Sequence, residues 1–190
     1  PFEREIRIEG LSFHFDDAPD RDILHDLSLT IRKGERIGIR GASGVGKTTL
    51  FNILLGFYRP TAGRITIDGR PLDETNLRKW QNTIGYVSQS VFIADSSFMQ
   101  NVALGCAPDR IDRRRAAQAL ETAKLKEFID TLPQGMETPI GECGCRLSGG
   151  QRQRIGIARS LYRRADVLFF DEATSALDSR TEGEINRSIA

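Results

Sequence analysis

The stretch from Gly41 to Thr48, Gly-Ala-Ser-Gly-Val-Gly-Lys-Thr, constrains the fold more than any other part of the chain. It matches the phosphate-loop pattern G-x-x-x-x-G-K-[ST], which requires a strand before it and a helix after it. Alternating apolar residues predict the strand over Arg36–Ile39, and helical spacing predicts the helix over Thr48–Tyr58, ended by Pro60 and Gly63. The pattern therefore predicts an α/β domain that binds a phosphate-containing ligand.

The chemistry of this loop follows from its residue types. Its glycines let successive backbone N–H groups turn inward around a phosphate, and the following helix adds the positive end of its dipole. Lys47 is expected to reach the β- and γ-phosphates of a nucleotide, and Thr48 to offer its hydroxyl to Mg²⁺. The alternative is an ordinary glycine turn before a helix, and the strand, loop and helix order argues against it.

Two adjacent carboxylates form a second candidate site. The apolar run Val167–Phe170 predicts a strand covered on both faces of a parallel sheet, and Asp171 and Glu172 follow at its C-terminal end. That edge is where open α/β sheets bind ligands. Asp171 is expected to hold Mg²⁺ through water, and Glu172 to accept a proton from, or orient, the attacking water. Alone, the pair is equally well explained as a solvated loop; beside a phosphate loop it predicts nucleotide hydrolysis.

The segment Leu147–Gln151, Leu-Ser-Gly-Gly-Gln, is the most specific feature of the sequence. Ser148 and Gln151 have the spacing of a capping box, which predicts that a helix begins beside Gly149 and Gly150. A glycine-flanked helix N-terminus with a serine hydroxyl is an anion site, yet the phosphate loop already supplies one for the same phosphates. A second anion site needs a second role.

Apolar periodicity predicts the remaining elements. The expected strands are Arg4–Ile8, Leu11–Phe15, Ile23–Ile31, Ile65–Ile67 and Ile84–Val87, and the expected helices are Asp112–Ile129 and one that starts after Ser179.

On these motifs and their order, the chain resembles the nucleotide-binding domain of ATP-binding cassette (ABC) proteins over essentially its whole length. Gln89 is similar to the glutamine of the family's Q-loop, and Ser175–Asp178 to its D-loop. Phe15 lies where an aromatic ring stacks on adenine, with Phe13 as the competing candidate. The resemblance implies ATP and Mg²⁺ as ligands, Glu172 as a catalytic residue, and Gln89 in both catalysis and metal binding.

The site implied by the resemblance falls into three groups. The catalytic residues are Glu172, Lys47 and Gln89. The metal ligands are Thr48, Gln89 and Asp171. The nucleotide-binding residues are Phe15, Gly41, Ser43, Gly44, Val45, Gly46, Lys47, Thr48, Thr49, Ser148, Gly149, Gly150 and Gln151.

The resemblance also implies a fold class. This is an α/β P-loop NTPase with a RecA-like core built on a mostly parallel sheet. An antiparallel β part is expected at about residues 1–35 and 62–70, and an inserted helical subdomain at about 92–150. Together they make a single nucleotide-binding domain over residues 1–190.

The partners implied by the resemblance are a second cassette, expected to form a homodimer, and a transmembrane domain on the same polypeptide. In a head-to-tail dimer, Ser148 and Gly150 of one chain cover the γ-phosphate of ATP that Lys47 of the other chain holds. Leu132–Gly135 and Pro139–Glu142 are similar to exporter segments. The resemblance also implies that the chain lies at the cytoplasmic face of the inner membrane. Two further segments resemble lipid-linked oligosaccharide flippases, namely Trp80–Gln81 and Phe92–Ser97.

The sequence departs from the family's pattern in one respect. The family carries a switch histidine on a strand beyond the D-loop, whereas the only histidines here are His14 and His25. We therefore expect a C-terminally shortened piece of a longer protein, one that binds ATP and hydrolyses it slowly.

Charge and motif content argue against other classes. Lys plus Arg is 27 and Asp plus Glu is 26, so a net charge of +1 gives no general attraction to nucleic acid. No apolar run approaches the roughly 18 residues that cross a bilayer. The Asn-Lys pair of a GTPase is absent, and the spacing from Lys47 to Ser148 leaves no room for the coiled coil of DNA-repair cassettes. A non-transport cassette ATPase, or a module that binds nucleotide with little hydrolysis, remains the alternative.

Overall fold

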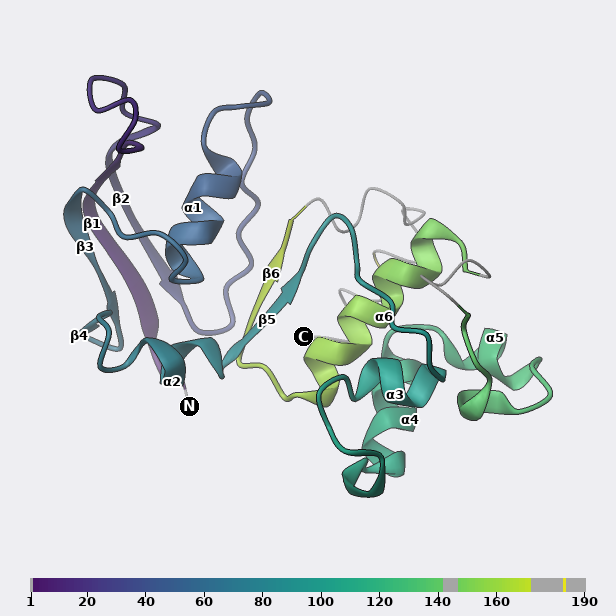
Figure 1. The fold of residues 1–190 in the computed structure, drawn as a ribbon. Helices are drawn as coiled ribbons and strands as arrows, with labels where there is room; N and C mark the ends of the chain where they lie inside the picture. Colours follow the sequence, from purple (N-terminus) through teal and green to yellow (C-terminus); the bar gives the residue numbers. More distant parts are fainter. Residues whose placement is uncertain (1, 142–146, 172–182, 184–190) are drawn as a thin grey trace. The chain divides into compact units, whose positions relative to one another are not determined.

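The computed structural model describes residues 2–141, 147–171 and 183, and the chain divides into two compact units, residues 1–84 and 85–190, each considered by itself (Figure 1). The elements in chain order are β1 (Glu5–Phe13), β2 (Leu24–Arg32), α1 (Lys47–Leu54), β3 (Ala62–Ile67), β4 (Arg70–Pro71), α2 (Leu77–Gln81), β5 (Ile84–Val87), α3 (Phe98–Val102), η1 (Pro108–Arg110), α4 (Arg113–Thr122), α5 (Lys126–Asp130), η2 (Gly135–Glu137), α6 (Gly149–Tyr162) and β6 (Val167–Phe170).

The first unit is built on an antiparallel sheet with the strand order β2-β1-β3-β4. The prediction of two separate strands, one on either side of Gly10, is wrong, because the single central strand β1 runs through this glycine. Gly10 takes a positive φ of 57°, and the pairing with β2 shifts register between Ile8 and Leu11. The glycine therefore produces a bulge, and the strand continues through it because both flanks still pair with β2 and β3.

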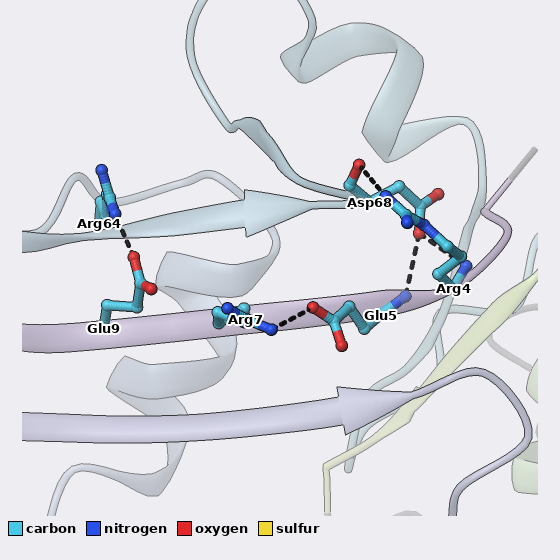
Figure 2. A network of polar contacts seen from close by, with 6 residues as sticks. All are labelled: Arg4, Glu5, Arg7, Glu9, Arg64 and Asp68. Atoms are coloured by element: carbon cyan, nitrogen blue, oxygen red, sulfur yellow. Dashed lines mark hydrogen bonds and ion pairs between the residues drawn. The ribbon is translucent and has the colours of Figure 1, made fainter.

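A tight turn joins β3 to β4 and holds the start of β1. Asp68 and Gly69 form it with φ values of 52° and 81°, as a two-residue hairpin with both central residues left-handed requires. The Asp68 carboxylate accepts backbone N–H bonds from Glu3 (2.8 Å), Arg4 (2.7 Å) and Glu5 (2.9 Å), as Figure 2 shows in part. Burial raises the pKa of Asp68, but these three donors outweigh it and lower the pKa below its ordinary 3.8.

The strand predicted at Arg36–Ile39 is wrong. Residues 35–40 take no regular structure, and the side chain of Ile37 is 43% exposed. Alternating residues indicate which faces a strand would have, but a strand also needs a neighbour that completes its hydrogen bonds.

The helix after the phosphate loop is shorter than predicted, because it ends at Leu54 and not at Tyr58. Gly56 takes a φ of 79°, its N–H bonds to the carbonyl of Ile53, and the N–H of Phe57 bonds to that of Asn52. This glycine-terminated pattern satisfies the last carbonyls of the helix well before Pro60.

The second unit combines helices with the strand pair β5-β6, both predicted correctly in position. A larger parallel sheet around this pair stays a prediction. The single helix expected over Asp112–Ile129 is wrong, since Lys124 takes a φ of 59° and separates α4 from α5. The apolar side chains shared by α3, α4, α5 and α6 form one buried cluster that includes Phe98, Val102, Leu120, Leu125, Ile129, Ile155 and Ala158. None of the described helices has the length and apolar character to span a membrane.

Candidate functional site

The phosphate loop of the first unit is shaped by positions that admit only glycine. Gly44 and Gly46 take φ values of 82° and 95°, which side-chain-bearing residues rarely adopt. A Cβ on Gly41 would lie 2.8 Å from Cγ2 of Val45, and one on Gly46 would lie 3.1 Å from the carbonyl oxygen of Ile23. The backbone at Gly41 and Gly46 thus lies close against Val45 and Ile23, and a side chain at either glycine would displace the loop.

Lys47 and the start of α1 supply positive charge to this loop. The Nζ of Lys47 donates to the carbonyl oxygens of Gly41 (2.9 Å) and Ala42 (2.8 Å), so the ammonium group lies within the turn of the loop. Gly46 is the N-cap of α1 and gives it no side-chain cap bond. The first-turn N–H groups are consequently not capped by a side chain, and this end of the helix can accept an anion.

Three aromatic rings pack together in the same unit. Phe13 is 6% exposed and stacks on Tyr58 with centroids 5.4 Å apart, which makes it part of the core. Phe15 is 39% exposed and meets both rings edge-on. Of the two phenylalanines, Phe15 is therefore the one with a face available to a ligand. Tyr58, which supports it, has no sequence signal of its own.

In the second unit, two predicted site residues leave the same end of the strand pair. Asp171 follows β6, and its N–H donates to the carbonyl of Val87, the last residue of β5, at 3.0 Å. Gln89 lies just beyond Val87 and is exposed. The hydroxyl of Tyr86 donates to Oδ2 of Asp171 at 3.2 Å. Burial, and then the negative charge of Asp171, raise the pKa of Tyr86, so the phenol stays protonated at neutral pH.

The capping box predicted at the start of α6 is present, which confirms that expectation. The hydroxyl oxygen of Ser148 accepts from the N–H of Gln151 at 3.2 Å, and the side chain of Gln151 accepts from the N–H of Ser148 at 2.8 Å. Because the Ser148 hydroxyl acts there as an acceptor, its own hydrogen remains available for donation to an anion.

The predicted site residues divide between the two units. The first holds Phe15 and the phosphate loop, and the second holds Gln89, Asp171 and the segment 147–151. Glu172 and the D-loop segment 175–178 lie outside the described residues. Oxygen donors of the Thr48, Gln89 and Asp171 types suit Mg²⁺. Within the described residues, no group of three or more His, Cys, Asp or Glu side chains could hold a metal.

The two histidines lie together at the surface of the first unit. Asp22 joins them, with its carboxylate oxygens 3.1 Å from Nδ1 of His25 and 3.3 Å from Nδ1 of His14. The bonds from His25 and then His14 lower the pKa of Asp22.

Similarity to known proteins agrees with the family that these motifs indicate. The family described as "ABC transporter" matches residues 24–175. An "ATP-dependent lipid A-core flippase" from Bordetella avium (strain 197N) is 41% identical over 189 residues, covering 100% of this chain and 32% of the relative. Its counterpart from Burkholderia mallei (strain ATCC 23344) is 44% identical over 185 residues, covering 97% of this chain and 30% of the relative.

A solved structure is similar over nearly the same extent. It is described as "Structure of a bacterial Atm1-family ABC exporter with ATP bound", with a TM-score of 0.88 and 38% identity, and it covers 98% of this chain and 32% of that one. The chain thus spans about a third of the length of the relatives it matches.

Proposed function

This chain belongs to the ABC transporter family, and we propose that it is the ATP-hydrolysing module of an exporter that moves a lipid-linked substrate across a membrane. The observation that carries the proposal is the phosphate loop, in which Lys47 lies against the carbonyls of Gly41 and Ala42 at the uncapped start of α1. This arrangement suits a polyphosphate, because it combines a fixed cation with backbone N–H groups that no side chain caps.

ATP binding is assigned to residues of the first unit. The backbone of residues 41–49 surrounds the β- and γ-phosphates, and Lys47 exchanges its two carbonyl partners for phosphate oxygens. The exposed face of Phe15 stacks on the adenine ring, supported edge-on by Phe13 and Tyr58.

Hydrolysis is assigned to residues that follow β5 and β6. Glu172 accepts the proton of the attacking water, and Gln89 orients that water. Thr48, Gln89 and Asp171 are the residues that would hold Mg²⁺, with Tyr86 fixing the carboxylate of Asp171. Held by these residues, Mg²⁺ would supply a positive charge that offsets the negative charge developing on the phosphate oxygens.

The second anion site, at the start of α6, supports a second copy of this chain as its partner. Ser148, Gly149 and Gly150 cover the γ-phosphate held by another copy in a head-to-tail homodimer, with one surface supplying both halves of the interface. The subdivision into a RecA-like core, an antiparallel β part and a helical subdomain belongs to the same proposal. A transmembrane domain on the same polypeptide, at the inner membrane, is also part of this proposal.

The relatives indicate the class of substrate. Those quoted above are named as lipid A-core flippases, and a substrate of the lipid A-core class is therefore the one we propose for the intact transporter. The described residues contain no membrane-spanning helix, so the contacts to such a substrate are proposed for the membrane domain.

One experiment tests the proposal directly. The purified chain is titrated with MgATP by calorimetry, and phosphate release is followed in the same preparation. We expect saturable binding and measurable release that both require Mg²⁺. Binding without release would favour a nucleotide-binding module, and absence of binding would contradict the assignment of the phosphate loop.

A further inference from the structure

A single arginine near the end of α6 holds a distant segment of the second unit. Nε of Arg159 donates to the carbonyl of Asn101 at 2.6 Å, and Nη2 donates to Oδ1 of Asn101 at 2.9 Å. Nη1 donates to the carbonyl of Phe92 at 2.5 Å. All three bonds end on neutral amide oxygens, so the guanidinium joins α6 to two other segments by its fork of donors.

Asn101 of α3 extends this connection along the backbone. It is fully buried, and its Oδ1 also accepts the N–H of Ala94 at 2.9 Å. Its Nδ2 donates to the carbonyls of Ala94 (2.9 Å) and Ser97 (3.1 Å) and to the hydroxyl of Ser96 (3.0 Å). One side chain thus satisfies much of the backbone of a loop that has no regular structure of its own.

Arg159 is partly buried, and its charge is therefore partly removed from water. Burial, and then the positive charge of Arg163, lower the pKa of Arg159 to about 10. The group is still charged at neutral pH, and a buried charge stabilises a structure only if its hydrogen bonds are made. The loop carbonyls are therefore held at the positions that the guanidinium requires.

We propose that Arg159 and Asn101 are positioning residues that fix the segment Phe92–Ser97, and with it Gln89, to the helix that begins at Ser148. The segment starts just after Gln89, and the helix carries the second anion site at its other end. The loop that follows Gln89 and the helix that follows Ser148 are in this way joined by hydrogen bonds. The inference rests on the proposed function, because Gln89 matters here only if it takes part in ATP hydrolysis.

The test is a double-mutant cycle of R159K and Q89A on ATP turnover in the full chain. Lysine keeps the charge but cannot reproduce the fork of donors. If Arg159 acts through Gln89, R159K lowers kcat about tenfold in the wild-type background and less than about twofold in Q89A, with KM for MgATP unchanged in both. A merely structural role would lower kcat by the same factor in both backgrounds, and that result overturns the proposal.

The matched control is R163K. Arg163 is the C-cap of the same helix and also donates to a backbone carbonyl, that of Leu104 at 3.3 Å, which lies outside the Phe92–Ser97 segment. We expect R163K to leave kcat within about twofold of wild type. If R159K does not fold, N101D replaces it in the cycle, because aspartate keeps the acceptor and loses the donors to Ala94, Ser96 and Ser97.

Hydrogen exchange separates this inference from the proposed function. The amide of Ala94 donates directly to Asn101, so its exchange reports the connection without any turnover. We expect R159K to speed that exchange about tenfold and R163K to leave it unchanged. An inactive wild-type chain would contradict the proposed function alone, whereas an unchanged Ala94 rate in R159K would overturn the connection.

Discussion

The hydroxyl of Tyr86, on β5, donates to Oδ2 of Asp171, the first residue after β6, across the paired strands. The backbone N–H of Asp171 is held as well, by the carbonyl of Val87. A proposed Mg²⁺ ligand is therefore oriented through both its main chain and its side chain before any nucleotide binds. A partner that orients a metal ligand in this way commonly matters for metal affinity.

Replacing Tyr86 by phenylalanine removes this donor and keeps the ring. We expect the Mg²⁺ or Mn²⁺ concentration that half-saturates the nucleotide complex to rise about tenfold, measured by electron paramagnetic resonance of Mn²⁺. Tyr162→Phe is the control, because its hydroxyl accepts the N–H of Asp112 at 3.1 Å and does not contact Asp171. Equal Mn²⁺ affinity in wild type and Tyr86→Phe would show that Asp171 needs no such support.

Lys47→Ala removes the cation of the phosphate loop. The loss of one charged hydrogen-bonding group should cost about 1.5–3 kcal/mol of MgATP affinity, measured by calorimetry. Lys33→Ala is the matched control, since Lys33 lies in the same unit and also donates to a backbone carbonyl, that of Phe2 at 2.7 Å. If both variants bind MgATP as wild type does, the phosphate loop is not the nucleotide site.

Glu172→Gln tests the proposed general base. The amide cannot accept the proton of the attacking water, so turnover should fall by about 10²–10⁴ while MgATP affinity is retained. Phosphate release and calorimetry are measured on the same protein. Glu137→Gln, on the surface of the second unit, should leave both values unchanged. Full hydrolysis by Glu172→Gln would assign the base to another residue.

Phe15→Ala removes the exposed ring of the aromatic group. We expect ATP to bind more weakly by about 1 kcal/mol, while Phe15→Tyr binds as wild type does. Inorganic triphosphate, which has no base, should bind equally to all three proteins. A loss shared by ATP and triphosphate would instead indicate a change in the phosphate loop.

Asp68→Asn tests the contact that holds the start of β1. The native carboxylate has a lowered pKa, so its stabilisation is present above the unfolded value near 3.8 and is lost as the pH falls through the folded pKa. Denaturant unfolding at pH 7 should show the variant less stable by about 1 kcal/mol, with the difference shrinking below pH 3.8. A difference that stays constant down to pH 3 would show that the charge of Asp68 does not matter.

Local signals predicted a large part of this structure. The capping box at Ser148 and the strands Ile84–Val87 and Val167–Phe170 were found from residue types at short range. Helix ends were less accurate, because a positive φ at Gly56 or Lys124 is set by packing that periodicity does not contain. For Lys124 the residue type itself gave no indication.

The contacts around the predicted site residues could not be predicted, since they join segments far apart in the chain. Tyr86 lies beside Asp171 only because β5 and β6 pair, and Arg159 reaches Phe92 only because α6 packs on α3. A tyrosine in a strand and an arginine in a helix have no spacing that reveals such partners. The motifs predicted which residues bind and react, whereas the residues that position them could be identified only from the fold.

The reciprocal bonds of Ser148 and Gln151 bear on how readily a bound anion leaves. These bonds satisfy the N–H groups of Ser148 and Gln151, and Gly149 and Gly150 are not buried, so an anion that departs leaves no buried donor without an acceptor. Release is then slowed only by the bonds made to the anion itself. A surface of this kind can attach to an anion and detach from it many times without local unfolding, as the head-to-tail contact proposed above would require.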